Sequence, residues 1–356
     1  MNYKIALIRG DGIGPEVVGE AVKVMEAIGE KFGHTFTYTD VLMGGCAIDA
    51  VGKSYPDGTA EACKACDAVL LGAVGGPKWG HASDPEKRPE TALLSIRRDL
   101  GLYANLRPAV LRPAMADACP LKKETAEKGI DLMMVRELTG GIYFGKRDRY
   151  QTEDRGEEAT DLMAYSEQEI ERIGRRAFEL ARLRRNKVSS VDKANVLETS
   201  RLWRETARRL AAQYPETEVE YLFVDNAAMQ LIRQPAHFDV IVTENMFGDI
   251  LTDEASVLGG SLGMLASASL GDGPALFEPI HGSYPQAAGR NIANPMAAIL
   301  SGALLLEHFG LKEEAETIRQ AVDHTIRDGF VTEDLARPGE RSCTTSEVGD
   351  RIRARI

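Results

Sequence analysis

The chain has 356 residues, of which 44% are hydrophobic and 27% are charged, and this length and composition suit a globular protein of two domains. Its net charge of −11, with no basic block interleaved with aromatic residues, argues against nucleic acid as a partner. No apolar run is long enough to span a membrane. An acidic protein that binds an anionic substrate must concentrate positive charge locally, so clusters of arginine mark candidate sites.

The cysteines and the N-terminus indicate a cellular compartment. There are five cysteines, and Cys63 and Cys66 form a CxxC pair without the second pair that a zinc site needs. The favoured interpretation is that both are small apolar residues on a helix. The chain enters a strand at once and has no signal-peptide pattern. We therefore expect a protein of the reducing cytoplasm.

Strands and helices alternate from the beginning of the chain. Tyr3 to Ile8 is typical of a strand, residues 17–28 carry apolar side chains at helical spacing, and Ala68 to Ala73 is typical of a buried strand. Residues 167–185 have a helical period whose arginines, Arg172 among them, are expected on a solvated face. Further short strands are predicted at 130–136, 187–191, 218–224 and 238–243. The alternation predicts an α/β architecture with a mainly parallel sheet.

Two stretches break this alternation. Residues 138–165 begin LTGGIYFG and continue through polar, acidic sequence, which indicates an arm or a lid that leaves the body. Residues 258–295 are rich in Gly, Ser and Pro and are expected to form a string of loops.

Two glycine-rich loops are candidate cofactor contacts. Gly10 to Glu16 follows the first strand and opens a helix with Pro15 in its first turn, but its GxGxG spacing misses the GxGxxG of a Rossmann loop. By itself it is weak evidence for NAD. Glu278 to Ser283 is a second loop of small residues, in which His281 could stack or hydrogen-bond, although a lone loop histidine usually does neither.

Three arginines stand at places where anions bind. Arg97 and Arg107 lie in LLSIRR and ANLRP, and Arg136 ends the apolar strand that precedes it. Guanidinium groups bind carboxylates bidentately, and a strand end faces the crevice where open α/β sheets bind ligands. Singly, each arginine is more simply a surface charge. Together with the acidic net charge, they indicate a site for a di- or tricarboxylate.

The segment 244–253, ENMFGDILTD, follows the buried strand 238–243. We expect a helix to begin at Gly248, which places Asp249 and Asp253 one turn apart on one face. Two such carboxylates repel each other unless a cation such as Mg²⁺ lies between them. The alternative is a solvated helix N-terminus, where acids favour the helix dipole. From the segment alone, the two interpretations have equal weight.

Three further side chains are candidates for proton transfer or metal binding. Lys193 follows a strand end, where loss of solvent would lower its pKa and suit it to proton transfer. Asp225 has a similar position and could be a third metal ligand. Tyr143, flanked by glycines, is a possible proton donor, although alone it is an ordinary loop tyrosine.

Taken together, the motifs resemble those of the 3-isopropylmalate dehydrogenases, within the β-decarboxylating dehydrogenases that include isocitrate dehydrogenase. The resemblance runs from Ile5 to the C-terminus and is highly specific to the superfamily. The motifs are GDGIGPE (10–16), ANLRP (104–108), RELTGGIYFG (136–145), VDKANVL (191–197), NMFGDILTDEAS (245–256), EPIHGS (278–283) and IANP (292–295).

The resemblance implies an α/β fold with the two lobes of this superfamily, not a standard Rossmann fold. One lobe, residues 1–105 and 263–356, would hold both termini and bind the cofactor. The other, residues 106–262, would carry metal and substrate residues and pair with its twin through the arm near 138–165. The implied protein is an obligate homodimer with a shared active site.

The implied reaction is oxidative decarboxylation of 3-isopropylmalate to 4-methyl-2-oxopentanoate with reduction of NAD, in leucine biosynthesis. Arg97, Arg107 and Arg136 would hold the two substrate carboxylates. Leu93 and Leu94, on the helix that carries Arg97, suit an isopropyl group, where isocitrate dehydrogenases place a polar residue.

The resemblance also assigns the metal and the protons. Asp249 and Asp253 would bind Mg²⁺ or Mn²⁺ with Asp225 of the partner subunit, which would also border the substrate. The metal acts as a Lewis acid in this chemistry. Lys193, also contributed across the dimer, and Tyr143 would handle protons.

For the cofactor, the resemblance implies contacts in the last part of the chain, at His281, Gly282, Ser283, Gln286, Asn294 and Asp334. The chain departs from the family pattern here. NAD-using relatives carry Ala-Pro-Asp after HGS, whereas this chain has Tyr-Pro-Gln at 284–286, so the acid that holds the ribose is missing. No Lys-Tyr pair of the NADP type stands at 286–287. NAD remains the expected cofactor.

Two rival functions stay open. A D-malate or tartrate dehydrogenase on the same scaffold would need a substrate panel to exclude it. A non-catalytic metabolite-binding homologue would require damage to the metal or proton-handling residues, all of which are present. A kinase or NTPase is disfavoured because the chain has no GxxxxGK[ST] motif.

Overall fold

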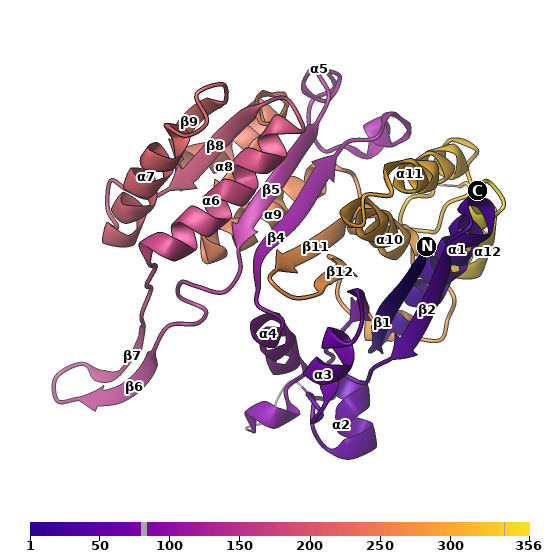
Figure 1. The fold of residues 1–356 in the computed structure, drawn as a ribbon, viewed down its shortest axis with the longest axis horizontal. Coiled ribbons are helices and arrows are strands. Elements are labelled where there is room, and N and C mark those ends of the chain that lie inside the picture. Colours follow the sequence, from indigo (N-terminus) through magenta and orange to yellow (C-terminus); the bar gives the residue numbers. More distant parts are fainter. Residues whose placement is uncertain (80–83, 338) are drawn as a thin grey trace. The chain divides into compact units, whose positions relative to one another are not determined.

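The computed structural model describes residues 1–79, 84–337 and 339–356, and these divide into two compact units (Figure 1). The first unit contains Met1–Leu102, Arg112–Pro120 and Gly259–Ile356, and the second contains Tyr103–Leu111 and Leu121–Leu258. The first unit therefore holds both chain termini. Among the described residues, no helix has the length and apolar character that crossing a bilayer requires.

The first unit is built on a five-stranded sheet in the order β2-β1-β3-β12-β11, parallel except for the β12/β11 pair. Its strands are β1 (Asn2–Gly10), β2 (Thr35–Asp40), β3 (Ala68–Ala73), β11 (Ala266–Gly271) and β12 (Ala275–Pro279). Its α-helices are α1 (Gly14–Phe32), α2 (Gly45–Val51), α3 (Thr59–Lys64), α4 (Pro89–Asp99), α10 (Met296–His308), α11 (Lys312–Arg327) and α12 (Thr345–Arg353). Short 3₁₀ turns are η1 (Pro85–Lys87), η2 (Pro113–Ala118), η4 (Leu262–Met264) and η5 (Pro285–Ala287).

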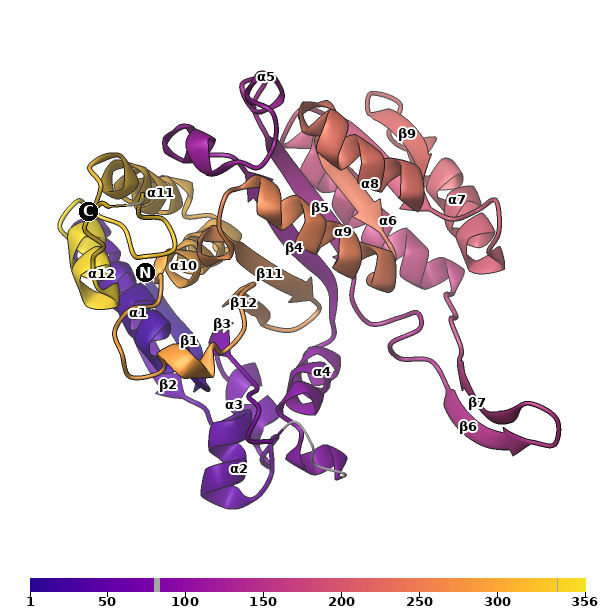
Figure 2. The same cartoon turned by 180° about the vertical axis from the view of Figure 1, so that it is seen from behind.

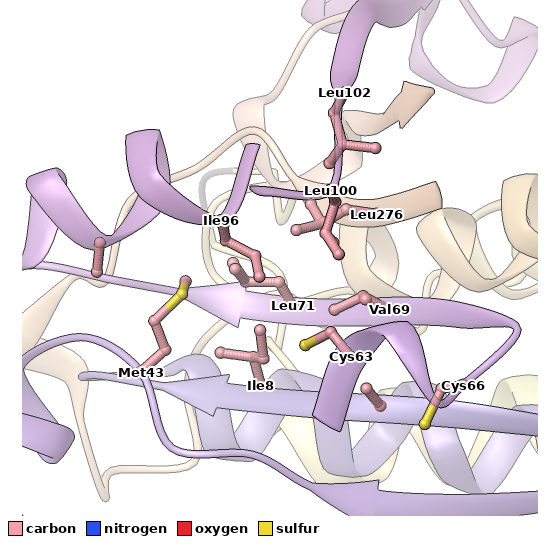
Figure 3. Close-up of a cluster of buried hydrophobic side chains, with 12 residues drawn as sticks. Ile8, Met43, Cys63, Cys66, Val69, Leu71, Ile96, Leu100, Leu102 and Leu276 are labelled. Carbon is pink, nitrogen blue, oxygen red and sulfur yellow. The ribbon is translucent and has the colours of Figure 1, made fainter. Parts of the chain in front are cut away.

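Alternate residues of the central strands bury opposite faces of this sheet, as the period of two requires. Ile8 of β1 and Leu71 of β3 point into the cluster of Figure 3, where Ile96 of α4 and Leu276 of β12 meet them. The other labelled members are Met43, Cys63, Cys66, Val69, Leu100 and Leu102. Both cysteines of the CxxC pair are thus core residues, and burial raises the pKa of the Cys63 thiol to about 12.

The second unit has a five-stranded sheet in the order β4-β5-β10-β8-β9, parallel except for the β4/β5 pair. Its strands are β4 (Leu102–Val110), β5 (Asp131–Glu137), β8 (Lys187–Asp192), β9 (Glu218–Phe223) and β10 (Val240–Thr243). Its helices are α5 (Lys123–Ala126), α6 (Glu167–Arg182), α7 (Glu198–Ala211), α8 (Val224–Arg233), η3 (Pro235–His237) and α9 (Asn245–Leu258). Helices α6 and α7 cover one face, and α8 and α9 cover the other (Figures 1 and 2).

The expected excursion at 138–165 is a two-stranded antiparallel hairpin of β6 (Arg147–Thr152) and β7 (Gly156–Asp161). It extends away from the body of its unit (Figure 2). Its residues are almost all exposed or half-buried, so the hairpin has no core of its own. An isolated two-stranded hairpin is marginal in water, which makes a packing partner a physical requirement for its order.

The expected string of loops at 258–295 is wrong in part, because β11 and β12 lie within it. Both strands are almost wholly buried, and β12 pairs with β3 on one side and with β11 on the other. Their small residues, ASASLG in β11, have low strand propensity, and a sequence window reads them as loop. Burial between neighbouring strands and α10 decides their conformation, which only the tertiary fold supplies.

The segment Arg112–Pro120 lies in the first unit, whereas the expected lobe boundaries placed it in the second. Arg112 forms an ion pair with Asp323 of α11. Met115 is buried, and a Cβ on Gly260 would lie 3.2 Å from its methyl carbon. These contacts join residues more than a hundred positions apart, so no local pattern indicates them.

Candidate active site

Arg136, at the end of β5, is fixed against the first turns of α9. The residue is 4% exposed, and its Nε and Nη2 donate to Oδ1 of Asn245 at 3.1 and 2.8 Å. Nη1 pairs with the carboxylate of Asp249. A Cβ on Gly248 would lie 2.6 Å from Cγ of Arg136, so only glycine at this position lets the arginine stem cross the helix. Arg136, the arginine predicted at a strand end, is therefore buried, and its direction is fixed by Asn245 and Asp249.

Helix α9 begins at Asn245, three residues before the expected start at Gly248. The reason is Glu244, whose carboxylate accepts hydrogen bonds from the backbone N–H groups of Met246 and Phe247 at 3.0 and 2.7 Å. A carboxylate here satisfies orphan donors of the first turn and interacts favourably with the helix dipole. Burial raises the pKa of Glu244, and these amide hydrogen bonds oppose that shift.

Tyr143 lies in the turn between β5 and β6 and donates a hydrogen bond from its hydroxyl to Oδ2 of Asp249 at 2.9 Å. The guanidinium of Arg136 lies 5.9 Å from the centre of the tyrosine ring. Burial, and then the hydrogen bond to Asp249, raise the pKa of Tyr143. The phenol thus keeps its proton at neutral pH and faces a charged pair, as an acid catalyst does.

Arg107, on β4, reaches the next turn of the same helix. Its Nε donates to Asn105 at 2.8 Å, and its Nη1 donates to Thr252 at 2.9 Å and to Asp253 at 3.1 Å. The side chain of Asp253 is 70% exposed, while that of Arg107 is 13% exposed. The second unit therefore brings together Arg107, Arg136, Tyr143, Asp249 and Asp253 on one helix face, as the motifs indicated.

Asp249 and Asp253 of α9 supply carboxylate oxygens, the donor atoms that a hard divalent cation prefers. Asp249 and Asp253 are partly exposed, at 38% and 70% of their side chains, and so have room for a further ligand. Within one chain, the part that the structure describes holds no group of three His, Cys, Asp or Glu side chains close enough for a metal. These two aspartates could supply two carboxylates to a cation, with water or a further ligand completing its coordination.

Lys193 and Asp225 form a separate pair in the same unit. Nζ of Lys193, just after β8, donates to Oδ1 of Asp225 in α8 at 2.5 Å. This hydrogen bond and the lysine charge lower the pKa of Asp225. The pair is partly exposed at the ends of β8 and β9, so both side chains are accessible to a ligand or a second chain.

Arg97 lies in the first unit, on α4, so the expected three-arginine cluster remains a prediction. Its Nη2 donates to Oε1 of Glu278 at 3.0 Å, and both side chains are nearly buried. Leu93, one turn earlier, packs partly against the core cluster of Figure 3, while Leu94 is exposed. The α4 surface thus presents an arginine beside apolar side chains.

A cavity of about 740 Å³ in the first unit contains most of the predicted cofactor residues. His281, Gly282, Asn294 and Asp334 line it, together with Tyr284, and the remaining lining residues are Ile13, Ser261, Leu262, Gly263, Ile292, Ala293 and Glu333. The volume suits part of a dinucleotide. Burial lowers the pKa of His281, which favours the neutral imidazole; Nδ1 lies 3.0 Å from the carbonyl of Gly282, and Nε2 is buried without a hydrogen-bond partner.

One wall of this cavity is fixed by Asp334. Its Oδ2 accepts hydrogen bonds from Ser261 at 2.8 Å and from Nδ2 of Asn294 at 3.0 Å, and its Oδ1 accepts one from Thr332 at 2.5 Å. Asp334 therefore fixes the side chains of Ser261, Asn294 and Thr332, a role that its position in the sequence did not indicate. Glu333 lies beside it, exposed, so the lining carries two acidic side chains.

The two glycine-rich loops meet at this cavity. The backbone N–H of Ile13 donates to the carbonyl of Ser283 at 2.8 Å, and a Cβ on Gly12 would collide with that carbonyl. Ser283 itself is buried and donates to the carbonyl of Gly75 at 2.8 Å, so it fixes the loop and does not line the cavity. Gln286 is exposed in η5 and is also outside the lining.

Several residues that matter to this geometry were not predicted. Asn245 and Glu278 stand inside motifs that the sequence singled out, but their roles as partners of Arg136 and Arg97 follow only from the fold. Arg172, expected on a solvated face, donates to Thr139 at 2.7 Å and stacks 4.6 Å from the ring centre of Tyr103. That expectation was wrong because helical spacing alone does not show which neighbours a helix face meets.

Known proteins resemble this chain over nearly its whole length. A sequence model of the isocitrate/isopropylmalate dehydrogenase family matches residues 4–352. A 3-isopropylmalate dehydrogenase of Priestia megaterium is 56% identical, covering all of this chain and 96% of that protein. One of Moorella thermoacetica is 55% identical and covers 99% of both.

Solved structures share the fold. Isocitrate dehydrogenase from Methylococcus capsulatus matches with a TM-score of 0.86 and 38% identity, covering 99% of both chains. A β-decarboxylating dehydrogenase from Thermococcus kodakarensis matches with a TM-score of 0.79 and 36% identity, covering 99% of this chain and 96% of that one. These likenesses confirm the expected α/β fold class.

Proposed function

The chain belongs to the isocitrate/isopropylmalate dehydrogenase family, and from this premise we propose that it oxidises and decarboxylates 3-isopropylmalate to 4-methyl-2-oxopentanoate with reduction of NAD. The reaction belongs to leucine biosynthesis. The observation that carries the substrate is the identity of more than 50% to full-length 3-isopropylmalate dehydrogenases. The chemistry of α4 supports it, since Arg97 suits a carboxylate and the leucines beside it suit an isopropyl group.

Substrate binding is assigned to the buried arginines. Arg136 and Arg107 present guanidinium groups that are held by amide and hydroxyl oxygens as well as by carboxylates. A substrate carboxylate that displaces part of these ion pairs gains charge-assisted hydrogen bonds without ordering a flexible side chain. Asp249 and Asp253 are thereby left available for a cation.

Proton transfer is assigned to Tyr143 and Lys193. Tyr143 keeps its proton at neutral pH and would protonate the enolate carbon that remains after carbon dioxide leaves. Lys193 would accept the C2 hydroxyl proton during oxidation. In the free chain its Nζ is positioned by the ion pair with Asp225, and it would have to give up a proton before it could act as a base.

Asp249 and Asp253, with Asp225 of the partner subunit, would hold Mg²⁺ or Mn²⁺. The bound ion supplies Lewis acidity to the oxygen atoms of the substrate. The donor set supports this proposal, because carboxylate oxygens suit these ions, and the described residues of one chain hold no group of three acids that would make a partner's aspartate superfluous.

NAD is the proposed cofactor, and the cavity of the first unit is its proposed site. Unpartnered Nε2 of His281 and the amide of Asn294 would contact the base and ribose. The lining carries Glu333 and Asp334, and the described lining residues include no Lys or Arg. An acidic lining disfavours the extra phosphate of NADP, which supports NAD even though Gln286 stands where an acid was expected.

We propose that two copies pair through unit 2. Helices α8 and α9 expose large apolar side chains at Met229, Ile232, Ile250 and Val257. Their exposure, at 45% to 61%, is unusual for a helix pair on one sheet face, and the coreless hairpin needs a partner as well. Pairing here would carry Lys193 and Asp225 toward the other chain's site.

Five free cysteines agree with a reducing cytoplasm.

The deciding experiment measures NAD and NADP reduction with 3-isopropylmalate, isocitrate, D-malate and tartrate, each with Mg²⁺ and after exhaustive chelation. We expect kcat/KM to be highest for 3-isopropylmalate with NAD and turnover to vanish without a divalent ion. Preference for D-malate or tartrate would replace the substrate assignment, and full turnover after chelation would remove the metal from the proposal.

A further inference from the structure

Tyr165 lies where the hairpin rejoins its unit, between β7 and α6, and it is 8% exposed. Its hydroxyl donates to Oε2 of Glu244 at 3.0 Å and accepts from the backbone N–H of Asn245 at 2.9 Å. Burial and the nearby carboxylates raise its pKa, so the phenol stays protonated and can make both bonds. This one hydroxyl therefore ties the hairpin base to the start of α9.

The ring of Tyr165 supports the turn that precedes Tyr143. A Cβ on Gly140 would lie 2.7 Å from Cε1 of the ring, and a Cβ on Gly141 would collide with the hydroxyl oxygen. Gly141 also has a φ of 74°, which favours glycine, and its N–H donates to the carbonyl of Ala164 at 3.1 Å. The backbone of the turn thus rests directly on the tyrosine ring.

The same contacts continue to the substrate-binding arginine. Nδ2 of Asn245 donates to the carbonyl of Gly140 at 3.1 Å, and its Oδ1 accepts from Arg136. The side-chain amide is therefore fixed on both sides, by the turn and by the guanidinium. Since Tyr165 holds the backbone of Asn245 and the turn together, both Arg136 and Tyr143 depend on its position.

We propose that Tyr165 is a positioning residue, which holds the Gly140–Gly141 turn and Asn245 so that Tyr143 and Arg136 face the substrate. The inference rests on the proposed function for its kinetic consequences. It adds a physical link between the hairpin base and the reacting groups, since Tyr143 precedes β6 and Tyr165 follows β7. Removal of the hydroxyl leaves the backbone N–H of Asn245 without its partner and frees the turn.

The first test compares Tyr165→Phe with Trp203→Phe. The rings of Trp203 and Tyr165 pack edge to face, with their centres 5.8 Å apart, and Nε1 of Trp203 donates to Oγ of Ser190 at 3.2 Å. Trp203→Phe therefore also removes a buried hydrogen bond from this aromatic pair, but it does not change the Gly140–Gly141 turn. We expect Tyr165→Phe to lower kcat by roughly tenfold to a hundredfold and to raise KM for the hydroxy acid, because small misplacements of reacting groups have effects of this size. The KM for NAD should stay within about twofold in both variants.

The second test asks whether Tyr165 acts through Tyr143. In a double-mutant cycle, Tyr143→Phe and the double variant Tyr143→Phe/Tyr165→Phe should have kcat values within about twofold of each other, because the reacting phenol is already lost, whereas KM for the hydroxy acid should still rise in the double variant through the displacement of Arg136. Multiplied losses in the double variant would overturn the proposal. So would a kcat and KM of Tyr165→Phe that match those of Trp203→Phe.

The third test does not depend on turnover. Hydrogen exchange of peptides covering residues 138–146 should be faster in Tyr165→Phe than in the wild type, with other peptides of the unit unchanged. If Tyr165→Phe does not fold, Gly140→Ala moves the turn off the ring, keeps both hydroxyl bonds and should show the same kinetic and exchange pattern. A wild type that does not turn over 3-isopropylmalate would remove the proposed function, while unchanged exchange at 138–146 would remove the positioning role.

Discussion

At the scale of single residues, each candidate catalytic side chain has a hydrogen-bond partner that fixes its direction. Tyr143 is held by Asp249, Arg136 by Asn245, and Lys193 by Asp225. Charge-assisted hydrogen bonds of this kind are stronger than neutral ones and restrict the side chain to one direction. The consequence is that conservative changes at these positions test chemistry with little change in packing.

Lys193→Met should lower kcat by roughly a hundredfold to ten-thousandfold, because it removes a positioned acid/base group. NAD affinity, measured by fluorescence titration, should be unchanged, since the proposed cofactor cavity is in the first unit. Lys187→Met is a matched control at the other end of β8, where the lysine pairs with Glu218, and its kcat should stay within about twofold. A near wild-type kcat for Lys193→Met would make Lys193 a structural residue.

Gln286→Asp should sharpen the preference for NAD. The wild type has an amide where the family resemblance leads us to expect an acid, and a neutral hydrogen bond to the ribose is weaker by about twofold than a charge-assisted one. The new carboxylate would also repel the 2′-phosphate of NADP. The measurement is kcat/KM with both cofactors, and Gln320→Asp on α11 serves as the control for added charge.

An outright preference of the wild type for NADP would contradict the cofactor assignment. It would mean that Arg290 or Arg337 reaches the phosphate. In the free chain, Arg290 donates to the carbonyl of Gln286 at 3.4 Å, and Arg337 pairs with Asp117 at 2.8 Å. Arg290→Ala and Arg337→Ala would then identify which arginine is responsible.

At the scale of elements, α9 connects the proposed substrate-binding arginine to the proposed metal ligands, because Gly248 in its first turn lets Arg136 pass beside Asp249. Gly248 is the position where Arg136 crosses the helix, and Asp249 follows it at once. Glycine in a helix interior is unfavourable by roughly 0.5–1 kcal/mol relative to alanine. Gly248 therefore lowers the intrinsic stability of α9 at the position where Arg136 crosses it.

Gly248→Ala should raise KM for the hydroxy acid and lower kcat/KM, because the new methyl group would lie 2.6 Å from Cγ of Arg136 and displace the guanidinium. Gly19→Ala in α1 is the matched control, since a Cβ there meets nothing within 4 Å. It should raise the free energy of unfolding by roughly 0.5–1 kcal/mol and leave KM unchanged. Steady-state kinetics and urea unfolding of both variants separate the effect of the contact from that of helix propensity.

At the scale of the whole molecule, the exposed helix pair and the hairpin support the proposal that two copies form the working unit. Met229 and Ile250 are exposed on helices α8 and α9, and within one chain the described residues bring no three proposed metal ligands together. A shared site would explain both observations with one interface. Pairing would also bury the apolar surface that a monomer leaves in water.

Reassortment of two inactive variants tests the sharing directly. When Lys193→Met and Asp253→Asn chains are mixed and exchanged, a mixed dimer should carry both lesions in one site and none in the other. We expect activity to reappear after exchange, approaching a quarter of the wild-type value if chains assort at random and each site works alone. Exchange verified by mass spectrometry with no recovered activity would contradict the shared site.

The sequence by itself was sufficient for the elements and motifs whose signals are local. Helical and strand periods placed β1, α1, β3 and α6, and the motifs, through the family that they resemble, singled out Arg136, Tyr143, Asp249 and Asp253, which lie together in one unit. The elements could be predicted because helical and strand periods are properties of short segments, and the roles of the four side chains stay predictions. Identity of more than 50% to 3-isopropylmalate dehydrogenases supports the proposed activity, and this likeness too is read from the sequence alone.

Only the tertiary structure decided which side chains hold these groups in place. The start of α9 at Asn245 depends on Glu244, and Glu244 is bonded to Tyr165, which lies 79 positions earlier in the chain. The small-residue strands β11 and β12 form because neighbouring strands and α10 bury them. Such contacts depend on topology and burial, and a polar group bonds whichever partner the fold brings within reach when water is excluded. The spacing of residues in a short segment therefore does not predict which partner a polar group will have.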